Sequence, residues 1–130
     1  MQSFFLILSV ILIIIVFAFL TKKKHGNEMT VAEAQELVKN PQITILDVRT
    51  PREFAQGHIE GARLIPVAEL SDRINELAPL KSKEILVYCY AGNRSKTACS
   101  ILEKNGFAAI KSLHGGITAW MKNGNKIVPG

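Results

Sequence analysis

The stretch Glu84-Ile-Leu-Val-Tyr-Cys-Tyr-Ala-Gly-Asn-Arg-Ser95 decides the fold. It opens with an apolar run that is typical of a buried strand ending at Cys89. A short loop containing Gly92 follows, and from about Ser95 to Asn105 the spacing predicts a helix that Gly106 closes. A strand, a compact loop and a helix in this order predict one unit of a largely parallel sheet.

The same alternation of strands and helices continues on both sides of this stretch. Thr30 and Glu33 form the pattern of a capping box, and Thr50 and Glu53 repeat it with Pro51 as the first helical residue. The predicted helices cover residues 30–39, 50–57, a segment after Ser71 bearing Ile74 and Leu77, and 117–121, and the remaining predicted strands cover 43–48, 62–65 and 110–113. The sequence therefore predicts an α/β domain with helices flanking a mostly parallel sheet.

Length and composition allow only one such domain. The chain has 130 residues, 48% of them hydrophobic, and its nine glycines and five prolines follow no period. This composition excludes disordered and collagen-like chains. The two cysteines, Cys89 and Cys99, are too few for a disulfide framework, and their spacing matches no zinc pattern, so we expect no metal and no cofactor.

The first residues have the character of a membrane helix. From Phe4 to Leu20 the chain carries no charge, and 15 of these 17 residues are Phe, Leu, Ile or Val. On insertion scales such a run contributes roughly −5 to −9 kcal/mol. We predict a single-pass transmembrane anchor over residues 1–24, in contact with the lipid bilayer through residues 4–20, and a folded domain over residues 25–130.

Charge predicts how this anchor is oriented. Lys22, Lys23 and Lys24 follow the apolar run directly, whereas no charged side chain precedes it, so the domain is expected to face the cytoplasm. A cleaved signal peptide is the alternative, but it favours basic residues before the run and small residues after it. Beyond these three lysines the balance is 13 basic against 11 acidic residues, which predicts no nucleic-acid partner.

The loop after Cys89 carries the chemistry. The predicted strand places the sulfur at the carboxyl edge of the sheet, where α/β proteins bind ligands. Backbone N–H groups of a Gly-containing turn, the start of the next helix and Arg94 all favour a charged sulfur, so we expect a nucleophilic thiolate. The structural alternative is an inert cysteine buried at the end of a strand.

Three motifs give the chain a family resemblance. The loop Cys89-Tyr-Ala-Gly-Asn-Arg-Ser95 resembles the active-site loop of the rhodanese (sulfurtransferase) family. Asp47-Val-Arg-Thr-Pro-Arg-Glu-Phe54 together with Gly57-His-Ile-Glu-Gly-Ala62 is similar to the first signature of that family, and Leu113-His-Gly-Gly-Ile-Thr-Ala-Trp120 is similar to its C-terminal signature. The resemblance covers residues 29–122 and implies a single rhodanese-like domain.

The resemblance also implies an activity and a set of site residues. Cys89 would take sulfane sulfur from a donor such as thiosulfate or a persulfide, hold it as a persulfide and pass it to cyanide or a thiol. The backbone of the loop would cradle the outer sulfur, which assigns substrate binding to Tyr90, Ala91, Gly92, Asn93, Arg94 and Ser95. Asp47 is expected to brace the loop by pairing with Arg94 or with Arg49.

Two other functions compete with this one. Related phosphatases use the pattern Cys-x5-Arg, but only four residues separate Cys89 from Arg94, and the smaller loop suits one sulfur atom better than a phosphoryl group. A membrane-tethered binding or scaffold module with a vestigial loop is the second alternative. Neither the physiological donor nor the acceptor follows from the sequence, because Arg94 is the only charged residue on the loop rim.

Three further residues are interpreted from their positions in the sequence. Cys99 lies ten residues after Cys89 and is expected in the core, with a resolving disulfide as its less favoured role. His58 is expected to hydrogen-bond to backbone groups. His114 is a candidate for the approach to the pocket.

Overall fold

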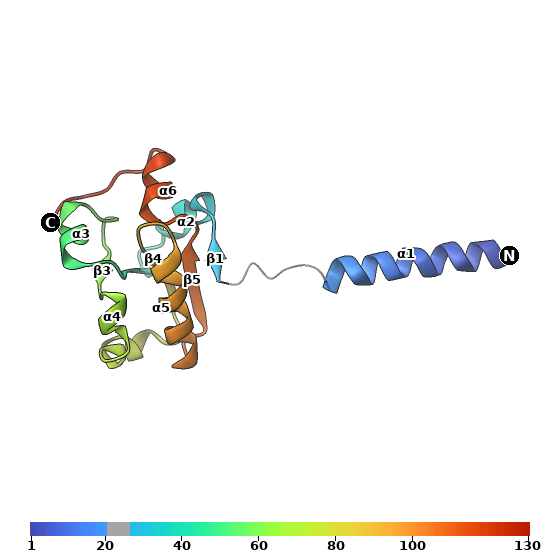
Figure 1. Cartoon of the computed structure of the whole chain (residues 1–130), viewed down its shortest axis with the longest axis horizontal. Coiled ribbons are helices and arrows are strands. Elements are labelled where there is room, and N and C mark those ends of the chain that lie inside the picture. The colour runs from blue at the N-terminus through green and yellow to red at the C-terminus, as the bar shows by residue number, and fades with distance from the viewer. Residues whose placement is uncertain (21–26) are drawn as a thin grey trace.

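The computed structural model describes residues 1–20 and 27–130 of the chain, so the basic segment Lys22–Lys24 lies outside the described residues. Figure 1 shows an N-terminal helix and a separate α/β domain. The helix is α1 (Gln2–Leu20). The domain consists of β1 (Glu28–Met29), α2 (Val31–Leu37), β2 (Thr44–Asp47), α3 (Pro51–Gln56), β3 (Arg63–Leu64), α4 (Val67–Leu70), the 3-10 helix η1 (Ile74–Leu80), β4 (Glu84–Tyr88), α5 (Asn93–Lys104), β5 (Ala109–Leu113) and α6 (Gly116–Lys122).

The five strands form one parallel sheet in the order β1-β5-β4-β2-β3, as an α/β domain requires. In this order β4 lies at the centre, with Asp47 at the end of β2 opposite Tyr88 at the end of β4. Parallel strands end at the same edge, so the residues that follow β2 and β4 are brought together. Cys89 is the first residue after β4, and Arg49 follows two residues after β2.

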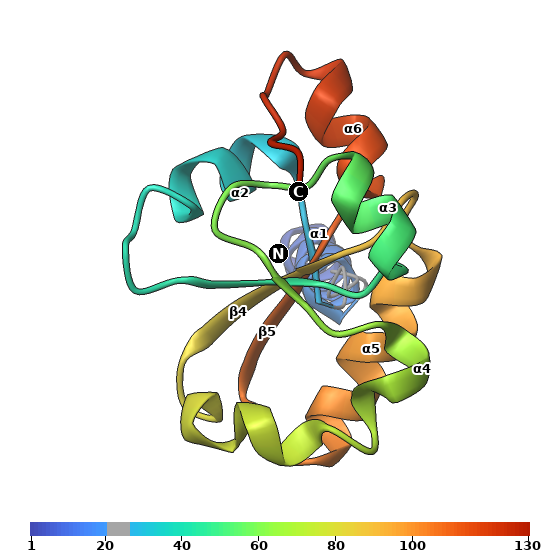
Figure 2. The ribbon, with the colours of Figure 1, turned by 90° about the vertical axis from the view of Figure 1, so that its left-hand side faces the viewer.

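The helices cover both faces of the sheet, because alternate residues of each strand point to opposite sides. Ile85, Val87 and Cys89 pack with α4, η1 and α5, whereas Leu86 and Tyr88 pack with α2 and α6. Figure 2 shows α2 and α6 on one side of the strands and α4 and α5 on the other. Both layers of the core therefore meet along β4, the strand that leads into the cysteine loop.

Capping residues set the start of two helices, as the sequence predicts. Thr50 and Glu53 form a complete capping box at α3, and Thr30 accepts a hydrogen bond from the Glu33 N–H at α2. Helix α2 ends at Leu37, two residues earlier than expected. Gly106 follows α5 with a φ of +88°, in the left-handed region that glycine adopts readily.

The structure differs from the sequence predictions at η1 and at β1. The helix expected after Ser71 is a 3-10 helix, and a short α-helix, α4, precedes it. Pro66 is the N-cap of α4, and Pro79 lies within η1, where it removes a backbone donor. The two-residue strand β1 was not predicted, because only its pairing with Ser112 and Leu113 of β5 makes it a strand.

Helix α6 holds the cysteine loop in place through its first turn. The N–H of Ile117 donates to the carbonyl of Cys89 at 2.8 Å, and the N–H of Thr118 donates to the carbonyl of Tyr90 at 3.2 Å. This close approach requires glycine at position 116, where φ is +63° and an added Cβ would collide with both carbonyl oxygens. The C-terminal signature thus supports the loop rather than forming a separate site.

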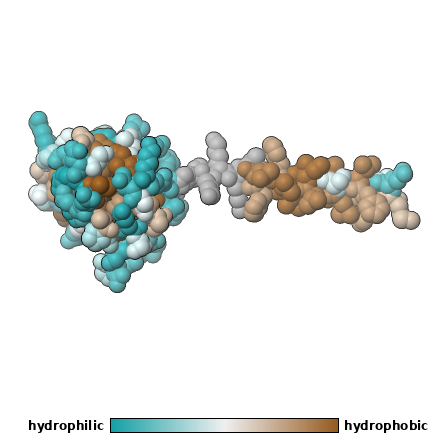
Figure 3. All heavy atoms as spheres, turned by 90° about the horizontal axis from the view of Figure 1, so that it is seen from below, coloured by the Kyte–Doolittle hydropathy of each residue, from teal (hydrophilic) through white to brown (hydrophobic). Residues whose placement is uncertain are grey.

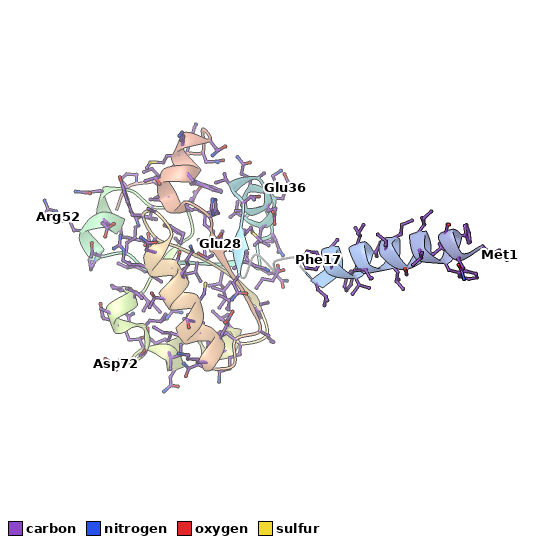
Figure 4. All side chains as sticks on the ribbon, turned by 45° about the vertical axis from the view of Figure 1, so that its right-hand side comes forward. Met1, Phe17, Glu28, Glu36, Arg52 and Asp72 are labelled. Atoms are coloured by element: carbon purple, nitrogen blue, oxygen red, sulfur yellow. The ribbon has the colours of Figure 1, made fainter. Side chains whose placement is uncertain are left out.

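Helix α1 is apolar on all sides and has no buried residue. In Figure 3 it is brown along most of its length, whereas the visible face of the domain is largely teal. Figure 4 shows its side chains projecting around the whole helix axis. Among the described helices, α1 is the one long and apolar enough to span a bilayer, and an N-terminal signal sequence has the same properties.

Replacing Gly116 with Ala tests the support that α6 gives to the loop. We expect a loss of about 3 kcal/mol or more in the free energy of unfolding, because left-handed strain adds to the collision with the loop backbone. Gly124→Ala is the matched control, since φ there is +83° but an added Cβ meets open space. It is expected to cost only about 1 to 2 kcal/mol. Urea unfolding of the full chain in detergent gives both values, and equal losses would contradict the support by α6.

Candidate active site

Cys89 lies at the carboxyl edge of the sheet, directly after the central strand. Its side chain is almost fully buried, with a relative exposure of 1%. The N–H of Gly92 donates to the sulfur at 3.0 Å, and the hydroxyl oxygen of Ser95 lies 3.6 Å from it. The loop therefore folds back over the sulfur and presents hydrogen-bonding groups to it.

The shape of the loop follows from Gly92 and from the start of α5. Gly92 is the N-cap of α5 and has a φ of +110°, which disfavours residues with a side chain. The backbone N–H groups of Ala91, Gly92 and Ser95 hydrogen-bond to the Cys89 sulfur. Inward-pointing N–H groups of this kind make a loop suited to an anion. The Ser95 hydroxyl closes the turn by donating to the carbonyl of Gly92 at 3.0 Å.

These groups lower the pKa of the Cys89 thiol. Burial acts in the opposite direction and would raise the pKa, because the interior disfavours a charge. Hydrogen bonds from the Ser95 hydroxyl and from the backbone N–H groups of Ser95, Gly92 and Ala91 outweigh burial, so the pKa lies below its ordinary value. Such a shift increases the thiolate fraction near neutral pH, and the thiolate is the nucleophilic form of cysteine.

Arg94 forms a bidentate ion pair with Glu53 rather than pairing with Asp47. Its two terminal nitrogens lie 2.6 and 2.9 Å from the two carboxylate oxygens of Glu53. The Arg94 guanidinium is the main reason why the pKa of Glu53 falls to about 2. Because Glu53 also caps α3 through Thr50, this pair ties the loop after β4 to the helix after β2.

Asp47 pairs with Arg49, the second of the two partners that the sequence suggested. The Arg49 guanidinium lies 2.7 Å from Oδ2 of Asp47 and donates to the carbonyl of Gly57 at the same distance. Both side chains are buried, and Arg49 lies 5.6 Å from the centre of the Tyr88 ring. The pair joins the end of β2 to the end of α3, so it acts on the loop only through the scaffold.

A cavity of about 200 Å³ opens beside the loop. Its lining includes Tyr90 of the loop and is completed by Arg49, Glu53, Gln56, Gly57, Ile117, Met121 and Ile127. Tyr90 is 54% exposed, in contrast to the buried Cys89. His114 does not line this cavity. It lies in a larger one, of about 260 Å³, beside Glu28 and Glu33.

Cys99 and His58 occupy structural positions. Cys99 is buried within α5, and burial raises the pKa of its thiol to about 12, which makes it a poor nucleophile. Nδ1 of His58 lies 2.9 Å from the carbonyl of Phe54, and the two rings stack. Within residues 1–20 and 27–130 no group of His, Cys, Asp or Glu side chains is arranged to hold a metal ion.

Two contributors to the site were missed by the sequence analysis. Glu53 was recognised as a helix cap, but its pairing with Arg94 spans 41 positions and depends on the strand order. Ser112 lies on β5 with its hydroxyl 2.7 Å from that of Ser95. Strand alternation, which puts Ser112 on the same face as the apolar Ile110, is the sequence signal that could have identified Ser112.

The chain is similar in sequence to proteins that are named sulfurtransferases. The chain is 36% identical over 95 residues to a sulfurtransferase from Allochromatium vinosum, covering 73% of this chain and 87% of that protein. It is 40% identical over 91 residues to the thiosulfate sulfurtransferase GlpE from Ectopseudomonas mendocina, covering 68% and 78% of the two chains.

A solved structure and a family model both show similarity to the rhodanese fold. A rhodanese-related protein from Thermoplasma volcanium superimposes with a TM-score of 0.72 and 33% identity, covering 79% of this chain and 98% of that one. The family model described as rhodanese-like domain matches residues 30–123. The family model covers β2 to β5, the cysteine loop and α6, and the chain therefore belongs to the rhodanese-like family.

Proposed function

We propose that this chain is a membrane-anchored sulfurtransferase that carries sulfane sulfur as a persulfide on Cys89. The observation that carries the proposal is the ring of hydrogen-bond donors around the Cys89 sulfur, which lowers its pKa although the side chain is buried. The names of the relatives, sulfurtransferase and thiosulfate sulfurtransferase, support the same activity.

The chemistry requires only the thiolate and two exchange steps. The Cys89 thiolate attacks the outer sulfur of thiosulfate, a sulfur–sulfur bond forms, and sulfite leaves with the electron pair of the bond that breaks. An acceptor such as cyanide then attacks the outer sulfur of the persulfide, which gives thiocyanate and restores the thiolate. Each step transfers one sulfane sulfur atom from one nucleophile to another, and the leaving group keeps the electron pair, so no external oxidant or reductant is consumed.

The loop serves the persulfide as well as the thiolate. The negative charge resides on the outer sulfur of a persulfide, which extends from Cys89 into the concave loop. The backbone N–H groups between Tyr90 and Ser95 are assigned the role of cradling it, since oriented amides stabilise anions in a site that excludes water. In this proposal the donor and the acceptor dock in the cavity beside Tyr90, the neighbour of Cys89 in the loop.

Two observations weigh against a phosphatase. A phosphatase arginine must face the phosphoryl oxygens, but both terminal nitrogens of Arg94 are engaged by Glu53. Ester cleavage also needs an acid that gives its proton to the leaving oxygen. Glu53, the carboxylic acid paired with Arg94, has a pKa of about 2 and is therefore ionised near neutral pH. The lowered pKa of Cys89 in turn disfavours a vestigial binding module, which has no use for a thiolate.

The membrane anchor and its orientation are part of the proposal. An uncleaved α1 would hold the domain at the membrane, and Lys22–Lys24 after it would keep the domain on the cytoplasmic side. The reducing cytoplasm protects a thiolate that cycles through a persulfide, because thiol reductants reopen stray disulfides.

Replacing Cys89 with Ser tests the chemistry. We expect kcat/KM for thiosulfate and cyanide to fall by at least about a thousandfold, because an alcohol neither ionises near neutral pH nor holds a persulfide. Cys99→Ser is the matched control and should stay within about threefold of the parent, since that thiol is buried and protonated. Mass spectrometry after thiosulfate treatment should find one added sulfur on Cys89. Turnover that survives in Cys89→Ser would overturn the assignment.

Replacing Glu53 with Gln tests the tie between α3 and the loop. We expect sulfur transfer to fall about three- to tenfold, because the charge-assisted bond that holds Arg94 is lost. The low pKa of Glu53 contributes stability that is complete above its ordinary pKa of 4.5 and is lost as pH falls towards about 2. Unfolding measured from pH 2 to 5 should therefore depend less on pH in the variant. Glu76→Gln, which breaks a surface pair with Arg73, should leave turnover unchanged.

Labelling of intact cells tests the orientation. A membrane-impermeant thiol reagent should leave Cys89 unlabelled until the cells are lysed, because the proposed orientation shields it behind the membrane. The N-terminus of the purified protein should begin at residue 1 or 2. A mature N-terminus near residue 25, or labelling of Cys89 in unbroken cells, would show instead that α1 is a signal peptide.

A further inference from the structure

Ser112 places a hydroxyl group inside the sheet, on the face covered by α5. The side chain is 2% exposed, and Ile110, two residues earlier on the same face of β5, belongs to the apolar core. Burying a hydroxyl is unfavourable unless it is hydrogen-bonded. The partner of Ser112 is Ser95 on α5, whose hydroxyl oxygen lies 2.7 Å away.

Ser95 in turn connects Ser112 to the Cys89 sulfur. The Ser95 oxygen lies 3.6 Å from that sulfur and 3.0 Å from the carbonyl oxygen of Gly92. The single proton of the Ser95 hydroxyl can therefore serve the sulfur, the Gly92 carbonyl or Ser112. A thiolate at Cys89 is stabilised by that proton in addition to the backbone N–H groups, so the direction in which Ser95 donates affects how well the charge is stabilised.

The available partners indicate which hydroxyl donates in the hydrogen bond between Ser112 and Ser95. In the described part of the structure, Ser95 is the hydrogen-bond partner of the Ser112 hydroxyl, so a donation by Ser112 satisfies its own proton. Ser95 then accepts from Ser112 and keeps its own proton for the loop. There it can donate to the Gly92 carbonyl, as in the structure, or to a thiolate at Cys89, which is the stronger acceptor because it is an anion. A hydroxyl that accepts a hydrogen bond becomes a stronger donor, because neighbouring bonds in a low-dielectric interior polarise one another.

We propose that Ser112 is a positioning residue, which donates to Ser95 and thereby directs the Ser95 hydroxyl to the Cys89 thiolate. The proposal rests on the proposed function in one respect, that Cys89 is the working thiol. Ser112 lies outside all three sequence motifs, so the proposal adds to the site a residue that none of them contains. Ser112 touches neither the sulfur nor the donor, and it acts only through Ser95.

Packing alone does not account for a serine at this position. A cavity of about 130 Å³ lies against Ser112, between β5 and the side chains of Lys96, Cys99 and Glu103 on α5. A valine or threonine, which β-strands favour, has room to grow into this space. The smaller, polar residue is therefore explained by its hydroxyl group and not by a shortage of volume.

Other groups act on the charge of Cys89 and must stay constant in any test. On α5 these are Arg94, whose charge is engaged by Glu53 of α3, and Cys99, whose buried thiol has a raised pKa. From the sheet, Asp47 and Arg49 form a closed ion pair at the end of β2. Around the cavity behind Ser112, Lys96 pairs with Glu28, while Glu103 lies on the same helix. Substitutions at Ser112 leave all of these charges in place.

The test measures the pKa of Cys89 without sulfur transfer. The full chain in detergent is alkylated with iodoacetamide across a range of pH, and the rate at Cys89 is followed by mass spectrometry. Trypsin separates residues 84–94, with Cys89, from residues 97–104, with Cys99. Ser112→Ala should raise the pKa of Cys89 by roughly half a unit or more, since it removes the polarising donor. Ser95→Ala, which removes the direct donor, should raise it further.

A matched pair separates the hydroxyl from its volume. Ser112→Thr and Ser112→Val have the same shape, but only threonine retains a hydroxyl. We expect Thr to keep the parent pKa and Val to reproduce the shift of Ala, even if both change stability. Ser100→Ala, another serine at this cavity, should have no effect. An unshifted pKa in Ser112→Ala, or equal shifts in Thr and Val, would overturn the proposal. Failure of sulfur transfer with these pKa shifts intact would instead contradict the proposed function.

Discussion

A cysteine sulfur buried in an apolar core yet surrounded by hydrogen-bond donors is the constraint on which the rest of this structure depends. Cys89 is buried on the face of β4 that packs with α5, where burial raises the pKa of a thiol. The N–H of Gly92 and the Ser95 hydroxyl offset this cost, because they lie beside the sulfur at 3.0 and 3.6 Å. The site is reactive only as long as the loop keeps these groups in place.

The surrounding elements hold that loop from two sides. Helix α6 donates backbone N–H groups to the carbonyls of Cys89 and Tyr90, and glycine at position 116 allows the close approach. On the other side, Glu53 forms an ion pair with Arg94, and the capping box of α3 fixes the position of Glu53. The parallel sheet makes both supports possible, since it brings the ends of β2, β4 and β5 to one edge.

Membership in the rhodanese-like family fixes the architecture, and the local contacts explain how this chain uses it. Asp47 and Arg49 form a buried ion pair, so the charge of Arg49 is offset by Asp47 where Arg49 lines the cavity beside the loop. Arg94 is likewise neutralised by Glu53. The loop therefore relies mainly on oriented N–H and hydroxyl dipoles, which suits the proposed persulfide, in which one negative charge moves from the inner to the outer sulfur.

The sequence by itself determined the α/β class, the cysteine loop, the capping box of α3 and the apolar leader, because each depends on neighbours close in the chain. It left the partner of Asp47 open between Arg49 and Arg94, and it did not distinguish the 3-10 helix η1, which contains Pro79, from an α-helix. Only the tertiary structure decided that Glu53 holds Arg94 and that Ser112 reaches Ser95. Those contacts cross between elements, and strand order and register, which local sequence patterns do not encode, bring their partners together.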